Sequence, residues 1–198
     1  MTSRSVHTAP WWARVRAEIA PHRRATAVGM ILTVPWAWWV SGPGWSTAAL
    51  LVAAIAAVPL YVIDLRTHRL PDVISLPMTG AVAVLLATAG LASGDLQALW
   101  RSMLGGAALG AAYLLLHVVN PSGLGFGDVK LALPLGMVTA WFGWPVLWGT
   151  AVLPFLIGGV VGLALIVTGR ATRKTAIAFG PFMLAGAAVA LTAARVLA

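Results

Sequence analysis

Long apolar segments, separated by short polar ones, run through almost the whole of this 198-residue chain. Hydrophobic residues make up 60% of the sequence and charged residues only 9%, whereas a soluble domain carries roughly a quarter charged residues. A helix that crosses a bilayer needs about 20 mostly apolar residues. The composition therefore excludes a soluble domain, a disordered chain and a coiled coil, and it predicts an all-α polytopic membrane protein.

About seven transmembrane helices are predicted from the apolar segments. They cover approximately residues 25–40, 46–63, 73–92, 100–119, 129–142, 145–168 and 176–197. The fifth segment, 129–142, is short for a crossing, so we expect it to be tilted or sheltered by its neighbours. Gly-xxx-Gly pairs at Gly106 and Gly110, and at Gly158 and Gly162, would allow close helix approach.

A basic segment, residues 1–24, precedes the first span. Its apolar residues recur at helical spacing among arginines, at Trp11, Trp12, Val15 and Ile19. This pattern is typical of an amphipathic helix that lies on a membrane surface. The chain is accordingly predicted to divide into an interfacial segment at 1–24 and a membrane-embedded domain at 25–198.

The basic residues indicate how the chain is oriented. The net charge is +8, from 13 Lys and Arg against 5 Asp and Glu. Alternating seven spans puts most cations on the side of the N-terminus, namely Arg4, Arg14, Arg16, Arg23, Arg24, Arg66, Arg69, Lys130, Arg170, Arg173 and Lys174. Only Arg101 and Arg195 fall on the other side. Because cytoplasmic loops are enriched in Lys and Arg, the N-terminus is predicted to be cytoplasmic and the C-terminus external. The charge favours membrane lipid, not nucleic acid, as a partner.

The chain is poor in residues that could carry chemistry. It contains no cysteine, which excludes a disulfide, a thiolate zinc site and a thiol nucleophile. The acidic residues are Glu18, Asp64, Asp72, Asp95 and Asp128. So few carboxylates make a metal site of several acids hard to build, and we expect neither a metal nor another cofactor. An aspartate pair is still available.

Asp64 and Asp128 lie at the predicted cytoplasmic ends of two apolar segments. An ionised carboxylate within the hydrocarbon costs roughly 3 kcal/mol or more, which favours a functional role for both residues. Gly125 and Gly127 precede Asp128 and let the backbone bend or another chain approach. Two neighbouring carboxyl groups can share one proton, so that one acts as general base and the other as general acid on a peptide bond.

Structural roles remain open for the same residues. Asp128 could cap the fifth helix, and Asp64 could pair with Arg66 or Arg69. Asp72 is expected to cap the third span, yet it is also the chief rival to Asp64 as the first catalytic acid. Lys130 could hold Asp128 in its charged form or bind a lipid phosphate. His117 is expected to form a packing hydrogen bond between helices.

Three motifs, taken in order, resemble those of type IV prepilin peptidases. They are Asp64-Leu-Arg-x-x-Arg69-Leu70-Pro71-Asp72, Gly125-Phe126-Gly127-Asp128-Val129-Lys130 and Phe179-Gly180-Pro181-Phe182. The resemblance implies an intramembrane aspartyl protease of the prokaryotic cytoplasmic membrane, with Asp64 and Asp128 catalytic. Phe179, Gly180 and Pro181 would help to shape the site.

The resemblance also implies a substrate class. It is a prepilin or pilin-like precursor whose short basic leader is removed, after a glycine, at the cytoplasmic membrane edge. Longer members of the family carry a cytoplasmic region with paired cysteines, associated with zinc and N-methylation. This cysteine-free chain resembles the short, peptidase-only form, so we do not expect methyltransferase activity.

Two other functions are compatible with these motifs. One is a different glycine-aspartate intramembrane protease, of the preflagellin or signal-peptide peptidase kind. The other is a small transporter or assembly scaffold that uses the aspartates to pass protons or cations. Acids in the middle of the membrane and matched half-repeats, which are typical of transporters, are not evident in the sequence. The sequence does not indicate an oligomeric state.

Overall fold

The computed structural model describes residues 10–121, 123–170, 172, 175 and 177–197, and the regular secondary structure within these ranges is all helical. The helices are α2 (Trp11–Ile19), the 3-10 helix η1 (Ala20–His22), α3 (Arg23–Ser41), α4 (Thr47–Thr67), α5 (Asp72–Ser93), α6 (Leu96–Val119), α7 (Phe126–Phe142), α8 (Trp144–Val167) and α9 (Gly180–Leu197). The predicted all-α membrane fold is confirmed, and each predicted apolar segment corresponds to one helix from α3 to α9.

The number of candidate spans is smaller than predicted. Among the described helices, five are long and apolar enough to cross a membrane, namely α4, α5, α6, α8 and α9. The 17 residues of α7 extend only about 26 Å, whereas the hydrocarbon core is about 30 Å thick. The 19-residue α3 begins with two arginines, Arg23 and Arg24, which shortens its apolar part. The last helix starts at Gly180, later than predicted.

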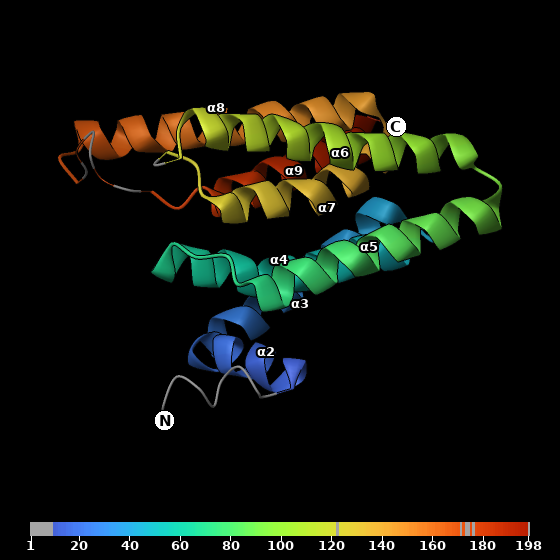
Figure 1. Ribbon diagram of the computed structural model, residues 1–198, viewed down its shortest axis with the longest axis horizontal. Coiled ribbons are helices and arrows are strands. Elements are labelled where there is room, and N and C mark those ends of the chain that lie inside the picture. Colours follow the sequence, from blue (N-terminus) through green and yellow to red (C-terminus); the bar gives the residue numbers. More distant parts are fainter. Residues whose placement is uncertain (1–9, 122, 171, 173–174, 176, 198) are drawn as a thin grey trace.

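The loops that follow α4, α6 and α8 lie at one end of the bundle, on the left in Figure 1. The connection between α5 and α6 lies at the opposite end. This is the alternation expected of helices that run up and down in sequence. The structure therefore gathers the loops next to Asp64 and Asp128 at the same end.

The predicted helix at Trp11, Trp12, Val15 and Ile19 is present as α2. Val15 and Ile19 pack against the core, whereas Trp11 and Trp12 are exposed. The Arg16 guanidinium lies 5.7 Å from the centre of the Trp12 ring. The helix is thus amphipathic. Residues 1–9 of the predicted basic segment, which include Arg4, fall outside the described residues, as do Arg173 and Lys174.

Helix α7 lies at the centre of the bundle, in contact with α4, α5, α6, α8 and α9. Leu131 and Ala132 on this helix are fully buried. Its closest neighbour is α6: a Cβ atom at Gly136 would fall 2.5 Å from the carbonyl oxygen of Gly105. The short fifth apolar segment is therefore sheltered by other helices, as predicted.

Three of the four glycines in the predicted pairs face a neighbouring helix, and the fourth, Gly162, faces Ile177 in the segment before α9. A Cβ atom at Gly106 would lie 2.5 Å from Met137 of α7, and one at Gly110 would lie 2.6 Å from Leu133. At Gly158 the nearest atom would be in Phe182 of α9, at 3.1 Å. Glycine on α6 thus permits a close approach that fixes the position of α7, and with it the position of Asp128.

Candidate active site

Asp64 lies in the last turn of α4, and only 5% of its surface is exposed. The backbone N–H of Gly180, the first residue of α9, donates a hydrogen bond of 3.1 Å to Asp64 Oδ2. The first N–H groups of a helix have no partner within the helix and favour a negative charge. Within the described residues, neither Arg66 nor Arg69 forms an ion pair with Asp64. The start of α9 therefore holds this carboxylate.

Asp128 is the third residue of α7, and 6% of its surface is exposed. Its Oδ2 atom accepts a hydrogen bond of 3.1 Å from the backbone N–H of Gly125, the residue that precedes the helix. This contact is the carboxylate half of a capping box. The predicted capping role of Asp128 is thus present. This capping role is compatible with a role in acid–base catalysis, because the hydrogen bond fixes the orientation of the carboxylate.

The two carboxylates are close enough for their charges to interact. Leu70, in the loop after α4, packs against a glycine beside each carboxylate, namely Gly127 and Gly180. A Cβ atom at Gly127 would lie 3.0 Å from Leu70 Cβ, and one at Gly180 would lie 3.4 Å from Leu70 Cδ1. Residues from all three sequence motifs therefore meet at one end of the bundle, although long stretches of chain separate them.

Asp72 and Lys130 form an ion pair beside this site. The distance from Lys130 Nζ to Asp72 Oδ1 is 2.6 Å, and 57% of the Asp72 side chain is exposed. The predicted capping role of Asp72 is wrong, because Pro71 precedes α5 and no side chain caps that helix end. Asp72 instead forms its ion pair with the Lys130 ammonium group on α7. Lys130 thus pairs with Asp72 rather than with Asp128, and it also lies 5.1 Å from the centre of the Phe126 ring.

Aromatic side chains pack next to the Gly180 N–H group. The ring of Phe179 lies 5.1 Å from that of Phe155 and 6.2 Å from that of Tyr113, measured between ring centres. Pro181 follows Gly180 in the first turn of α9 and is buried. The Phe-Gly-Pro motif therefore supplies a hydrogen-bond donor to Asp64 and an aromatic ring that packs with Tyr113 and Phe155.

Tyr113 and His117, on α6, also face Asp128. His117 Nδ1 forms a hydrogen bond of 2.7 Å with the carbonyl oxygen of Leu124, in the loop before α7, which confirms its predicted packing role. Tyr113 is 2% exposed, its hydroxyl has no hydrogen-bond partner within the described residues, and it interacts electrostatically with Asp128. The sequence analysis missed Tyr113. Its spacing of one helical turn from His117 is the only signal that pointed to it.

No cluster of three or more His, Cys, Asp or Glu residues that could hold a metal ion occurs in the part of the chain that the structure describes. Tyr113 and His117 interact electrostatically with Asp128, and His68, directly after α4, interacts electrostatically with Asp64. Two carboxyl groups, a phenol and two imidazoles are therefore available at this site.

A bundle of apolar helices, five of them long enough to cross a membrane, with two buried aspartates at one end is typical of an integral membrane protein. Residues 48–167 match the type IV leader peptidase family, and the chain belongs to that family. The resemblance inferred from the motifs is confirmed. No solved structure matches the chain.

The chain is similar to curated proteins that carry the name prepilin leader peptidase/N-methyltransferase. The chain is 33% identical to the Stutzerimonas stutzeri protein and 30% identical to the Pseudomonas aeruginosa protein, each over 77% of this chain and 52% of the relative. It is 33% identical to the Escherichia coli protein over 73% of this chain and 63% of that relative. The chain therefore spans about half the length of the first two.

Proposed function

We propose that this protein is an aspartic endopeptidase that removes the short basic leader from type IV prepilin or pilin-like precursors. One observation carries the proposal: Asp64 and Asp128, from separate helices, are both buried at the same end of the bundle (Figure 1), where Leu70 packs against Gly127, next to Asp128, and against Gly180, which donates to Asp64. Membership of the type IV leader peptidase family and the names of the relatives support the substrate class.

The proposed reaction is hydrolysis of one amide bond by an activated water molecule. The ionised aspartate takes a proton from water, and the resulting hydroxide forms a bond to the scissile carbonyl carbon. The protonated aspartate donates its proton to the carbonyl oxygen. The first aspartate then passes the proton it took from water to the leaving nitrogen and the C–N bond breaks, while the second aspartate takes a proton back from a hydroxyl of the tetrahedral intermediate. One carboxylic acid and one amine are released, and the pair again holds one proton. No metal and no covalent enzyme intermediate are required.

The backbone N–H groups of Gly125 and Gly180 support this role by holding one oxygen of each carboxylate. Both donors belong to the main chain, so they cannot take up or lose a proton during the reaction. They fix the direction in which each carboxylate faces, and fixed reacting groups need less reorganisation before the transition state.

We further propose that the site faces the cytoplasm from a prokaryotic cytoplasmic membrane, with the N-terminus on the same side. The excess of Lys and Arg near that end of the bundle supports this orientation. The chain itself has no cysteine with which to form a thiolate zinc site. We therefore propose peptidase activity without N-methyl transfer for the chain as given.

The test is leader removal from a purified pilin-like precursor by protein in membranes. Asp64→Asn and Asp128→Asn should each lower the rate by about 100-fold or more, because a general acid or base is lost. Asp72→Asn is the matched control, since it removes an exposed carboxylate only eight positions from Asp64. Full processing by either dyad variant, at equal protein level, would contradict the proposal.

A further inference from the structure

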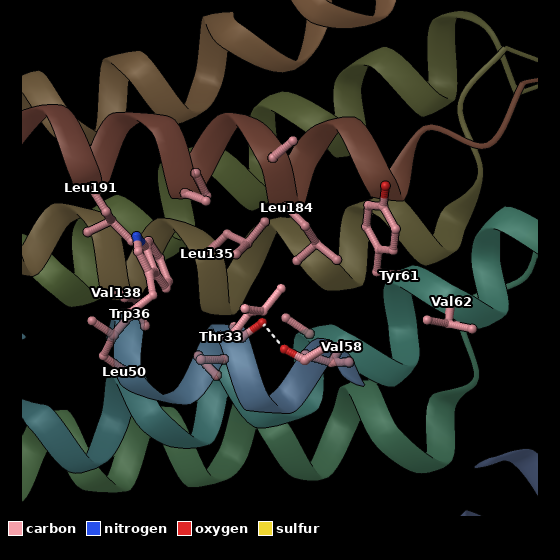
Figure 2. A pocket seen from close by; sticks show the side chains of 18 of the residues that line it. Thr33, Trp36, Leu50, Val58, Tyr61, Val62, Leu135, Val138, Leu184 and Leu191 are labelled. Atoms are coloured by element: carbon pink, nitrogen blue, oxygen red, sulfur yellow. Dashed lines mark hydrogen bonds between the residues drawn. The ribbon is translucent and has the colours of Figure 1, made fainter. Parts of the chain in front are cut away.

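An apolar groove of about 690 Å³ runs along one side of the bundle between four helices. Figure 2 shows its side chains, contributed by α3, α4, α7 and α9. Val28 and Leu32, which line the α3 side, are largely exposed. The groove is therefore open sideways, towards the region that lipid occupies around a membrane protein.

The groove begins about one helical turn from Asp64 on α4 and from Gly180 on α9. Three helices contribute both a site residue and a lining residue, and the spacing within each pair keeps both on one helix face. Tyr61 precedes Asp64 by three positions on α4, Leu184 follows Gly180 by four on α9, and Leu135 follows Asp128 by seven on α7. Separations of three, four and seven residues correspond to one or two helical turns.

The other end of the groove is closed by a contact between α3 and α9. Trp36 Nε1 donates a hydrogen bond of 2.9 Å to Thr192 Oγ1, and Trp36 lines the groove there together with Leu50 and Leu191 (Figure 2). From Leu50 to Val62 the groove follows α4 for about 18 Å, at 1.5 Å per residue. That length accommodates about three turns of helix.

Arg24 and Tyr61 also line the groove, whereas the polar groups of Thr33, Trp36 and Thr139 already have hydrogen-bond partners. Thr33 Oγ1 donates to the carbonyl oxygen of Gly29, and Thr139 Oγ1 donates to that of Leu135, both at 2.7 Å. The Trp36 N–H already has its partner in Thr192. An extended peptide in this groove would leave its backbone N–H and C=O groups without partners. A helix forms its backbone hydrogen bonds internally, so its N–H and C=O groups keep their partners in an apolar groove.

We propose that this groove binds the apolar helix of the precursor, the segment that follows the scissile bond. The inference rests on the proposed function and adds where the substrate lies. A helix between α3, α4, α7 and α9 would leave its N-terminal end beside Asp64 and Asp128, where the chain must unwind to expose a peptide bond. A lipid acyl chain fits the same chemistry, but it would give no reason for the groove to begin about one helical turn from Asp64.

Photocrosslinking tests where the precursor helix lies. A photoreactive amino acid is placed at Ala57 or Ala185, two partly buried residues that line the groove, and at Ala112, an exposed position on α6 outside it. The background is Asp128→Asn, so that the precursor is not consumed. The probe is a membrane-inserted precursor with a basic leader and an apolar helix of about 20 residues. Adducts with that helix from Ala57 and Ala185, but not from Ala112, are expected.

Filling the groove provides a second test on protein with both aspartates intact. Ala57→Trp should slow leader removal by about tenfold, equivalent to about 1.4 kcal/mol. Ala112→Trp should change the rate by less than about twofold, because surface substitutions have small effects. A melting temperature equal to that of the wild type shows that the Trp variant is folded.

The outcomes separate the groove from the proposed function. A wild type that cleaves the precursor, with groove positions that crosslink only to lipid or no better than Ala112, overturns the inference and leaves the peptidase standing. Equal cleavage by Ala57→Trp and the wild type also overturns it. A wild type that cleaves no precursor overturns the proposed function, whatever the crosslinks show.

Discussion

The backbone N–H of Gly180 and the carboxylate of Asp64 are in direct contact, although 116 positions separate them in the sequence. The donor nitrogen lies 3.1 Å from Asp64 Oδ2, and a Cβ atom added at Gly180 would lie only 2.6 Å from the same oxygen. A methyl group cannot approach an oxygen so closely. Glycine at this position therefore permits the hydrogen bond that orients the carboxylate.

Gly180→Ala should damage the site with little effect on the helix itself. Alanine is a better helix former than glycine, so α9 should still begin at this position, but Asp64 must move away from the added Cβ atom. We expect leader removal to fall by about tenfold or more, as displacement of a catalytic group by about 1 Å can cost 100-fold. Activity and melting temperature are measured on the same preparation.

Gly159→Ala on α8 is the matched control, because a Cβ atom there would meet nothing within 4 Å. It should keep both activity and stability. Wild-type activity in Gly180→Ala would show that the contact with Asp64 has no part in the reaction.

The pair formed by Asp72 and Lys130 should contribute little to stability. More than half of the Asp72 side chain is exposed, and exposed ion pairs contribute about 0–1 kcal/mol. Unfolding of Asp72→Asn, Lys130→Gln and the double variant gives the coupling energy of the pair. We expect it to lie below about 1 kcal/mol. A much larger value would mean that the pair holds α5 against the start of α7.

The fold could be predicted largely from the sequence, because apolar runs and the turns between them depend on local composition. Each of the seven apolar segments became a helix. The start of the last helix was less predictable, since Ile177 and Phe179 are as apolar as the residues inside it. The number of candidate spans was overestimated because α7, with 17 residues, is short for a crossing and because Arg23 and Arg24 shorten the apolar part of α3.

The candidate site could be predicted only in part. Asp64 and Asp128 are conspicuous because carboxylates are so rare in this chain. The contact between Gly125 and Asp128 is local and corresponds to the capping role that the sequence predicts. The contact between Gly180 and Asp64 joins segments 116 positions apart, which no local pattern encodes. The same is true of the ion pair between Asp72 and Lys130, 58 positions apart, and of Tyr113, which looks like an ordinary aromatic residue of a membrane helix.

Arg101 should stabilise the far end of α7. Its Nε donates a hydrogen bond of 2.6 Å to the carbonyl oxygen of Ala140, and its guanidinium also contacts the carbonyl oxygen of Trp141. These carbonyls belong to the last turn of the helix, which favours a cation. Arg101→Ala should lower stability by about 1.5–3 kcal/mol, measured by unfolding in detergent.

Arg101→Lys should restore only part of the loss, since an ammonium cannot reproduce the forked geometry of the guanidinium. Arg195→Ala, which removes an exposed arginine near the end of α9, is the control for charge alone and should be neutral. An equal effect of both alanine variants would assign the stabilisation to net charge rather than to the contacts with α7.

Tyr113→Phe should separate a role in chemistry from a role in packing. Phenylalanine keeps the ring beside Phe155 and Phe179 and removes only the buried hydroxyl, which has no partner within the described residues. An unpaired buried polar group costs about 1–3 kcal/mol, so the melting temperature should stay the same or rise. Leader removal should nevertheless slow by about tenfold, because the variant loses the buried phenol that interacts electrostatically with Asp128.

The comparison of activity with stability decides the role of Tyr113. Slower cleavage by a protein that is at least as stable as the wild type assigns the hydroxyl to the reaction, because loss of packing would lower both together. Unchanged cleavage with higher stability would instead show that Tyr113 has only a packing role. Asp64 and Asp128 would then be oriented by the backbone N–H groups of Gly180 and Gly125 without help from the phenol.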